Sequence, residues 1–339
     1  MEELTYKMHS DIVTGPYQVT IDITNKCNLR CMHCFNFSGE NNYINDELTD
    51  DEVISLINDL CNMKLLNICI CGGEPLLRKD LVIKIAKILN DNGTKCSMVT
   101  NGILLDDNTA HQLKIAGIDR VQISIDGIGK SHDKLRGVKG AYNHAINAIK
   151  NLQKYNIPTG IAFAPTKWNI DEFLDVLQIS LENCIKELRI QALMPIGRGE
   201  KNSEEIIPSI TDYRKLMKYI NVAKKMTKGS DLIIEWGDPI DHLIRLPGKL
   251  YCASIISIRA NGNITPSVYL PISFGNIRNH TFQEYWNAGL GKVWTLDILK
   301  QISDKYTSVN NMNTSKYNLP KTFIDNDIYI DIIDEEIFK

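Results

Sequence analysis

The chain has 339 residues with a formal net charge of -3, from 38 basic and 41 acidic side chains, and 43% of its residues are apolar. This composition predicts a packed globular core and gives no support for a nucleic-acid-binding surface, which needs clustered Lys and Arg. No apolar run approaches the roughly 18 residues of a membrane span, and residues 1–16 contain no hydrophobic signal segment. We therefore expect a cytoplasmic protein with neither nucleic acid nor a membrane among its partners.

Short β-branched runs alternate with amphipathic helical stretches from residue 17 to residue 236. The first helix begins after Thr49, and Glu52 follows three residues later, which is the spacing of a capping box. Strands are expected at residues 19–24, 66–71, 96–100, 120–125, 159–164, 187–193 and 232–236. Further helices are expected at residues 80–92, 107–116, 141–155, 170–183 and 211–228.

Strands and helices that alternate at about 30 residues per unit predict repeated βα units and a parallel sheet. About six such units predict an α/β fold, a partial (β/α)6 TIM-like barrel. An open doubly wound sheet is the alternative that periodicity does not exclude. In both arrangements ligands bind at the C-terminal ends of the strands, so the residues that follow the strands are the candidates for a functional site.

The pattern divides the chain into four parts: an N-terminal segment at 1–16, the barrel at 17–236, a small α+β extension at 237–300, and a polar linker with an acidic tail at 301–339. Residues 260–263 carry a hairpin signal within the extension. Residues 328–333 alternate, which predicts a strand that covers the barrel or docks with a partner. An exposed terminus is the alternative.

Three cysteines follow the first expected strand at the spacing C-x3-C-x2-C: Cys27, Cys31 and Cys34. In a reducing compartment, such a group indicates metal ligation or catalysis rather than disulfides. Zinc sites use two pairs of ligands or four in all, and no second C-x2-C follows here. Three protein ligands on a four-iron cluster leave one iron open, as catalysis requires. The alternatives are a degenerate zinc site and three incidental thiols.

With Phe35 directly after the last cysteine, this loop resembles the motif of the radical S-adenosylmethionine (SAM) superfamily. The resemblance implies that Cys27, Cys31 and Cys34 bind three irons of a 4Fe-4S cluster, while SAM chelates the fourth. It also implies that one electron from the cluster splits SAM into methionine and a 5'-deoxyadenosyl radical, which abstracts hydrogen from a substrate.

Further matches follow the next strands. Gly72-Gly73-Glu74-Pro75 comes after the second strand and resembles the motif that orients the methionine ammonium group. The resemblance implies that Ser124 and Arg136 bind the cofactor carboxylate, and a bidentate arginine suits that role. It implies apolar contacts to the adenine after the sixth strand. The cofactor-binding candidates are Phe35, Gly72, Gly73, Glu74, Asn101, Ser124, Asp126, Arg136, Leu193 and Met194, with Asp126 expected near the ribose.

For these residues the alternatives are turn capping, surface ion pairing and core packing, the last especially for Leu193 and Met194. Cys69 and Cys71 alternate on a strand, so one of them is expected to face the barrel interior. The remaining cysteines Cys61, Cys96 and Cys184 are expected in the core.

The extension resembles the SPASM or twitch extensions, which bind auxiliary iron-sulfur clusters in enzymes that mature peptides and cofactors. The family pattern has a cysteine after a proline, but Ser267 follows Pro266 here, and no cysteine occurs after Cys252. We therefore expect the scaffold of the extension without a fully cysteine-ligated auxiliary cluster. Cys252 is either a buried thiol or, as a catalytic candidate, a hydrogen-atom donor to a substrate radical.

The resemblance covers roughly residues 17 to 290 and implies radical modification of a ribosomally made peptide, by epimerisation or cross-linking. Modification of a small molecule, such as a sugar or a cofactor precursor, is a second option. A non-catalytic iron-sulfur or zinc scaffold protein is a third, from another class. The expected partners are the substrate, a reducing electron donor such as flavodoxin or ferredoxin, and a separate leader-peptide-binding protein.

Overall fold

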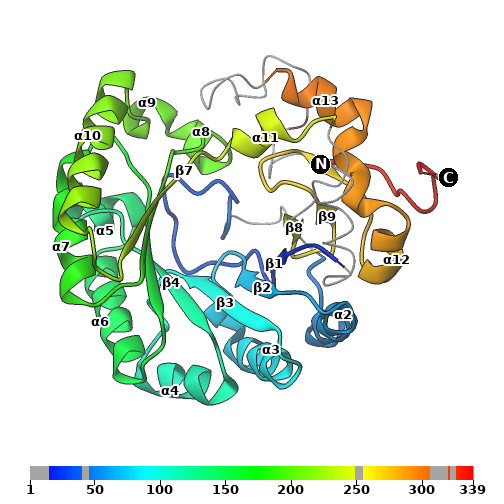
Figure 1. Ribbon diagram of the computed structural model, residues 1–339, viewed down its shortest axis with the longest axis horizontal. Coiled ribbons are helices and arrows are strands. Elements are labelled where there is room, and N and C mark those ends of the chain that lie inside the picture. The colour runs from blue at the N-terminus through cyan, green and yellow to red at the C-terminus, as the bar shows by residue number, and fades with distance from the viewer. Residues whose placement is uncertain (1–14, 40–45, 249–254, 306–319, 321–325, 339) are drawn as a thin grey trace.

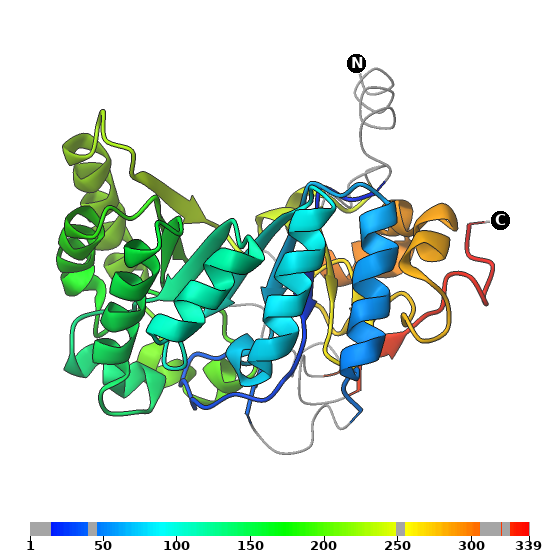
Figure 2. The ribbon, with the colours of Figure 1, turned by 90° about the horizontal axis from the view of Figure 1, so that it is seen from below.

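The computed structural model describes residues 15–39, 46–248, 255–305, 320 and 326–338. Within these residues no helix combines the length and the apolar character that crossing a membrane requires. Figure 1 shows a strongly curved sheet with helices around its outside, and Figure 2 shows the same helices from below.

The main sheet has nine strands in the order β7-β6-β5-β4-β3-β2-β1-β8-β9. Its strands are β1 (Gln18–Asp22), β2 (Asn67–Cys71), β3 (Lys95–Thr100), β4 (Arg120–Ser124), β5 (Thr159–Phe163), β6 (Glu187–Gln191), β7 (Ile233–Gly237), β8 (Ile255–Ile258) and β9 (Ile264–Thr265). Each strand from β1 to β7 pairs in parallel with the next one along the chain. Because this order never reverses, the partial barrel is confirmed and the doubly wound alternative is wrong.

Helices cover the outer face of this sheet (Figure 1). They are α2 (Asp50–Asn62), α3 (Lys79–Asp91), α4 (Asp107–Ala116), α6 (Ala141–Lys154), α7 (Phe173–Glu182) and α10 (Ile210–Met226). Three short helices follow the ends of β4 and β6: α5 (Lys130–Arg136), α8 (Arg198–Lys201) and α9 (Ser203–Ile206). The expected boundaries hold to within about two residues, apart from residues 170–172, which form a 3-10 turn before α7. The capping box at Thr49 and Glu52 is confirmed, since each side chain accepts the other residue's backbone N–H.

Side chains alternate between the two faces of each strand. On β2, Ile68 and Ile70 have no exposed surface and pack in the layer between sheet and helices. Cys69 and Cys71 therefore both face the barrel interior, and their Sγ atoms lie 3.6 Å apart. The expectation that one of them faces inward is corrected to both, because residues two apart on a strand share a face. Cys96 is buried as expected and Cys61 is partly buried, but Cys184 is exposed. The core prediction was wrong for Cys184 because it lies in the turn after α7, with a φ of +45°.

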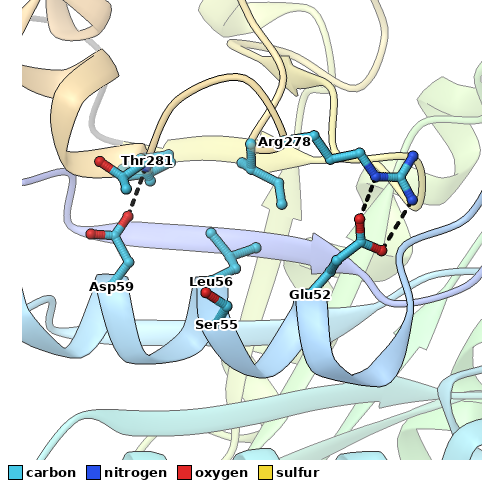
Figure 3. A pocket seen from close by; sticks show the side chains of 8 residues that line it. Glu52, Ser55, Leu56, Asp59, Arg278 and Thr281 are labelled. Carbon is cyan, nitrogen blue, oxygen red and sulfur yellow. Dashed lines mark hydrogen bonds and ion pairs between the residues drawn. The ribbon is translucent and has the colours of Figure 1, made fainter.

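The C-terminal extension contains α11 (Asp241–Arg245), β10 (Ile272–Ser273), α12 (Phe282–Asn287) and α13 (Asp297–Ser303). It packs on α2, as Figure 3 shows for the two ends of that contact. Asp59 accepts hydrogen bonds from the backbone N–H groups of Phe282 (2.7 Å) and Gln283 (3.2 Å) at the start of α12. Glu52 pairs with Arg278. The hairpin predicted at residues 260–263 is confirmed, because β8 and β9 pair antiparallel.

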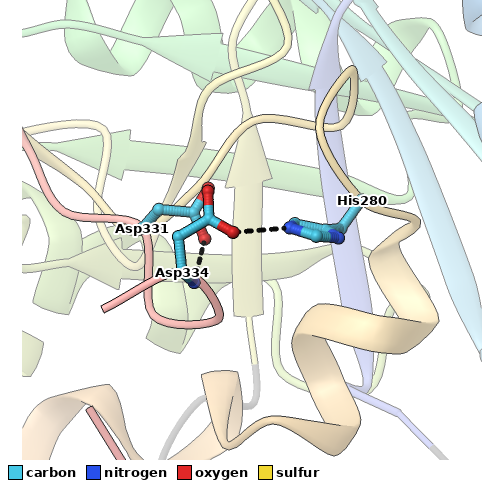
Figure 4. A group of neighbouring side chains, drawn as sticks. All are labelled: His280, Asp331 and Asp334. Atoms are coloured by element: carbon cyan, nitrogen blue, oxygen red, sulfur yellow. Dashed lines mark hydrogen bonds and ion pairs between the residues drawn. The ribbon is translucent and has the colours of Figure 1, made fainter. Parts of the chain in front are cut away.

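The tail forms the short strand β11 (Ile328–Tyr329), which pairs in parallel with β10. Asp331 fixes it by accepting hydrogen bonds from Tyr285 (2.7 Å) and Tyr329 (3.0 Å). His280 contacts Asp334 at 3.1 Å beside it (Figure 4). The strand prediction is confirmed for two residues, but this strand docks on the extension of its own chain and does not cover the barrel.

Candidate active site

The three cysteines of the C-x3-C-x2-C motif lie in the loop of residues 23–39 that follows β1 (the cysteine loop). Cys31 is 7% exposed, and Cys27 and Cys34 are partly buried. A tight turn joins the last two, because Cys34 N–H donates to Cys31 O at 3.2 Å. The Leu29 N–H donates to Cys27 Sγ at 3.4 Å. The motif therefore places three sulfur atoms in one partly enclosed loop.

The spacing of these sulfur atoms bears on which metal they suit. Two thiolates on one tetrahedral zinc ion, at the usual Zn–S distance of about 2.3 Å, lie about 3.8 Å apart. Among the described residues, the donor atoms of His280, Asp331 and Asp334 all lie within 4.8 Å of one another, whereas those of the three cysteines do not. At least one pair of the three sulfur atoms therefore lies farther apart than two ligands of one zinc ion.

Burial sets the protonation of these thiols. It raises the pKa of Cys27 above its ordinary value and raises the pKa of Cys31 to about 12. Without a metal both are therefore neutral thiols near neutral pH. A metal ligand must be a thiolate, so metal binding to this loop releases protons.

The Gly-Gly-Glu loop after β2 packs directly on the cysteine loop. Gly73 N–H donates to Thr24 O at 2.7 Å, and Glu74 N–H donates to Lys26 O at 2.9 Å. A Cβ atom on Gly72 would lie 2.3 Å from Thr24 O, and one on Gly73 would lie 2.2 Å from Lys26 O. Sequence analysis named these glycines as cofactor-binding candidates. The close approach seen in the structure is between two loops of the protein.

Glu74 is fully buried, and its carboxylate joins the loops after β2 and β3. Oε1 accepts hydrogen bonds from Thr100 Oγ1 at 2.6 Å and from Leu76 N at 3.1 Å. Oε2 accepts one from Asn101 N at 2.9 Å. Burial raises the pKa of this carboxyl, while these hydrogen bonds oppose the rise. A carboxylate has about four acceptor sites, so one remains for an ammonium group.

The loop after β3 also contacts the cysteine loop, because Asn101 Nδ2 donates to Asn28 Oδ1 at 2.8 Å. Ser124 ends β4 and is 9% exposed. Its hydroxyl makes no hydrogen bond with any residue in the described part of the chain. It is therefore available to a ligand at the C-terminal end of the sheet.

Asp126 and Arg136 form a buried ion pair beside the cysteine loop. The Arg136 Nε–H donates to Asp126 Oδ2 at 2.6 Å, and the Ala164 N–H donates to Asp126 Oδ1 at 2.8 Å. Burial acts to raise the pKa of Asp126, but Arg136 and two nearby histidines hold it below its ordinary value. Arg136 Nη1 lies 3.8 Å from Cys31 Sγ. Asp126 thus positions Arg136 at the cysteines, and its expected ribose contact remains a prediction.

Sequence analysis did not single out Arg198 as a site residue. Its Nε–H donates to Cys31 O at 2.9 Å, and its backbone N–H donates to Cys34 O at 2.9 Å. Gly197, at a φ of +60°, allows this contact, since a Cβ there would lie 2.4 Å from Phe35 O. The signal in the sequence was the run Gly197-Arg198-Gly199, a few residues after the end of β6.

The apolar candidates lie in packed surroundings. Leu193 is 2% exposed and clusters with Leu135 and Ile206, and Met194 is 5% exposed in the main core. The Phe35 ring meets the Tyr269 ring edge-on, with centroids 5.4 Å apart. This burial is consistent with both roles considered for Leu193 and Met194: packing in the core and contact with the adenine.

Two expectations concern the extension. Ser267, at the position where the family pattern has a cysteine, is 4% exposed, and its hydroxyl lies 2.8 Å from His242 Nε2. Cys252, the candidate hydrogen-atom donor, lies outside the described residues. Its role stays a prediction.

Comparison with known proteins identifies the family. Residues 21–179 match the radical SAM superfamily model. The pre-heme d1 synthase of Dinoroseobacter shibae is 32% identical over 316 residues, which cover 85% of this chain and 78% of that protein. The chain belongs to the radical SAM superfamily.

The names of other similar proteins give different activities. The AdoMet-dependent heme synthase of Methanosarcina barkeri is 28% identical, covering 81% of this chain and 83% of that protein. The sporulation killing factor maturation protein SkfB of Bacillus subtilis is also 28% identical, covering 90% of this chain and 72% of that protein. Crystalline SuiB of Streptococcus suis bound to S-adenosylmethionine matches the fold with a TM-score of 0.65 at 17% identity, over 86% of this chain and 69% of that one.

Membership of the radical SAM superfamily establishes the class and the cofactors. The chain is an enzyme, so the non-catalytic scaffold alternative is set aside. Its cofactors are a 4Fe-4S cluster and SAM. The relatives include both peptide-modifying and heme-forming enzymes, and the substrate class is therefore open.

Proposed function

We propose that Cys27, Cys31 and Cys34 hold the 4Fe-4S cluster, and that SAM binds in the ring of loops around them. One observation supports this most strongly. The loops after β2, β3, β4 and β6 each contact the cysteine loop, through Glu74, Asn101, Arg136 and Arg198 in turn. Loops at the C-terminal ends of parallel strands are where such folds bind ligands.

Each polar residue has a defined task in this proposal. The cluster, when bound, supplies one electron that splits SAM into methionine and a 5'-deoxyadenosyl radical able to abstract hydrogen from a substrate. Glu74 accepts a hydrogen bond from the ammonium group of the cofactor. Ser124 and Arg136 donate to its carboxylate, and Asp126 keeps the Arg136 fork in place. Arg198 holds the cysteine loop in place by donating hydrogen bonds to backbone carbonyls of that loop.

The proposed substrate is a ribosomally made peptide, modified by epimerisation or cross-linking. Support comes from the likeness to SkfB and to the PqqA peptide cyclase of Bradyrhizobium diazoefficiens, which is 26% identical. The fold also matches SuiB bound to its precursor peptide, with a TM-score of 0.65. A flavodoxin or ferredoxin would supply the electron, and a separate protein would recognise the leader peptide.

A test uses anaerobically reconstituted enzyme with dithionite and SAM. The proposal predicts 5'-deoxyadenosine in wild type and none in Arg136→Ala, while Arg245→Ala, which loses an exposed ion pair, keeps wild-type formation. Any short peptide encoded beside the gene is then added in deuterated water. Epimerisation introduces one deuterium, and cross-linking removes two hydrogen atoms. If 5'-deoxyadenosine forms normally but the peptide stays unmodified, the proposed peptide substrate is contradicted, while the proposed cluster and SAM site are not.

A second candidate substrate is a tetrapyrrole precursor of a heme-like cofactor. It is favoured by the pre-heme d1 synthase, which is the relative at 32% identity, and by the AdoMet-dependent heme synthase. Supplying a tetrapyrrole in place of the peptide in the same assay, with product identified by mass, separates the two candidates.

A further inference from the structure

Arg189 stands in the middle of β6 and points into the barrel. Its chain neighbours Leu188 and Ile190 have no exposed surface and pack in the core outside the sheet. Since side chains alternate along a strand, Arg189 lies on the opposite, inner face. Its register partner on β5 is Ala162.

Among the described residues, the guanidinium of Arg189 has no hydrogen-bond or ion-pair partner, and its Nε–H is buried without an acceptor. Two other arginines near the barrel interior do have carboxylate partners: Arg120 pairs with Glu187, and Arg136 pairs with Asp126. Buried donors in folded proteins are almost always paired, so an unpaired one calls for an explanation, such as a missing ligand.

Two small residues and one acidic residue neighbour Arg189. Its register partner on β7 is Glu235, and in the described structure no ion pair joins the two side chains. Ala162 lies beside it on β5, and Gly237 lies beside it on β7, where an added Cβ atom would be 3.8 Å from Arg189 Nε. Larger side chains at these positions would occupy the space next to the guanidinium. Gln191, also on the inner face and two residues nearer the C-terminal end of β6, donates to the Tyr269 hydroxyl at 2.6 Å. Arg189 and Gln191 thus lie on the same face of β6, and Gln191 leads through Tyr269 to Phe35 in the cysteine loop.

The charge of Arg189 also reaches across the barrel. The pKa of Cys69 on β2 is lowered, chiefly by the hydrogen bond from Cys71, with Arg189 adding to the effect. This agrees with the inner-face position that the alternation of side chains along β6 gives Arg189.

We propose that Arg189 binds a carboxylate group of the substrate inside the barrel. This inference rests on the proposed function and extends it to the chemistry of the substrate. A guanidinium fork binds a carboxylate through two parallel hydrogen bonds, which fix orientation as well as position. Both candidate substrate classes can present such a group, as a tetrapyrrole propionate or as an acidic side chain of a peptide.

Binding to the SAM-loaded holoenzyme tests this with two matched pairs of probes. The first pair is iron coproporphyrin III and its tetramethyl ester. The second is a pool of blocked hexapeptides that carry a single glutamate and the same pool with glutamine. The proteins are wild type, Arg189→Gln, Arg189→Lys and Arg245→Gln, the last removing an exposed arginine that pairs with Asp241. Unfolding temperatures show whether each variant is folded.

The proposal predicts that wild type and Arg245→Gln bind one acidic probe at least about tenfold more tightly than its neutral counterpart. Arg189→Gln removes this preference, and Arg189→Lys keeps part of it. The probe pair that shows the preference identifies the source of the carboxylate. A preference unchanged in Arg189→Gln, or no preference in either pair, would overturn the proposal.

A separate measurement covers the cofactor. SAM affinity and 5'-deoxyadenosine formation without substrate are expected to be the same in Arg189→Gln and wild type. A loss of SAM affinity in this variant would assign Arg189 to the cofactor carboxylate and overturn the proposal. Absence of 5'-deoxyadenosine from the wild-type reaction would instead contradict the proposed function. The binding assay with acidic and neutral probes would still test the role of Arg189.

Discussion

The carboxylate of Asp126, which is 1% exposed, pairs with the guanidinium of Arg136, whose Nε–H donates to Oδ2 at 2.6 Å. This pair fixes the orientation of the arginine and leaves Nη1 at 3.8 Å from Cys31 Sγ. A positive charge is thus held beside the cysteine loop by a buried negative one. That arrangement suits a cofactor whose carboxylate must lie next to the cluster.

Asp126→Asn tests whether Asp126 positions Arg136. The substitution keeps the shape but removes the charge that compensates a buried guanidinium, which typically costs about 3 to 5 kcal/mol of unfolding free energy. We expect a lower unfolding temperature and weaker SAM binding by calorimetry. Asp171→Asn, which breaks an exposed pair with Lys215, should change both by little. Wild-type SAM affinity in Asp126→Asn would show that the pair has no positioning role.

Gly73→Ala tests the contact between the Gly-Gly-Glu loop and the cysteine loop. The new Cβ would lie 2.2 Å from Lys26 O, so the cysteine loop must move. We expect reconstituted iron per chain to fall severalfold. Gly93→Ala is the control, because a Cβ there meets no atom within 4 Å and only the backbone strain at a φ of +73° is added. Equal iron contents in the two variants would count against the contact.

Much of this arrangement could be predicted from the sequence, because its signals are local. Alternating β-branched runs and the capping box at Thr49 mark the ends of elements within a few residues of chain. The placement of the cysteines after β1 and of Glu74 after β2 then followed from the rule for parallel strands.

Contacts between distant segments could not be predicted in this way. Arg198 reaches Cys31 across 167 residues, and β11 pairs with β10 across more than fifty. Neither pairing leaves a periodic pattern in the sequence. Similarly, nothing local indicates that Asp126 takes Arg136 as its partner, or that Arg189 has no partner among the residues that the structure describes. Both depend on how strands and loops meet in three dimensions.

His132 should make stability fall as pH falls. Burial lowers its pKa from 6.5 to about 4, and its Nδ1 accepts the Asp126 N–H at 3.0 Å, which requires the neutral ring. Between pH 6.5 and about 4 the unfolded chain binds a proton that the native chain does not. As the pH is lowered through this window, His132 therefore reduces the free energy of unfolding by up to about 1.4 kcal/mol per pH unit.

Urea unfolding at several pH values measures this effect. His132→Asn should reduce the slope of unfolding free energy against pH in that window. His144→Asn, which removes an exposed ring, should keep the wild-type slope. If His132→Asn kept it as well, His132 would not be the source.

Asp59 is expected to stabilise the contact between α2 and the extension. It accepts two N–H groups at the start of α12, where helices have unsatisfied donors (Figure 3). By analogy with N-cap residues, Asp59→Ala should cost about 1 kcal/mol of unfolding free energy. Asn58→Ala, which truncates the exposed residue directly before Asp59 in α2, should cost less. Equal losses in thermal unfolding would mean that the carboxylate does not cap α12.

The central claim is that Cys27, Cys31 and Cys34 together hold an iron-sulfur cluster that leaves one iron for SAM. Metal analysis of anaerobically purified and reconstituted protein, combined with an assay for 5'-deoxyadenosine, tests it most directly. The account predicts about four irons per chain in wild type, with 5'-deoxyadenosine formed, and loss of both in Cys31→Ser but not in Cys184→Ser. One zinc ion per chain bound by these cysteines, with no iron and no 5'-deoxyadenosine, would contradict it.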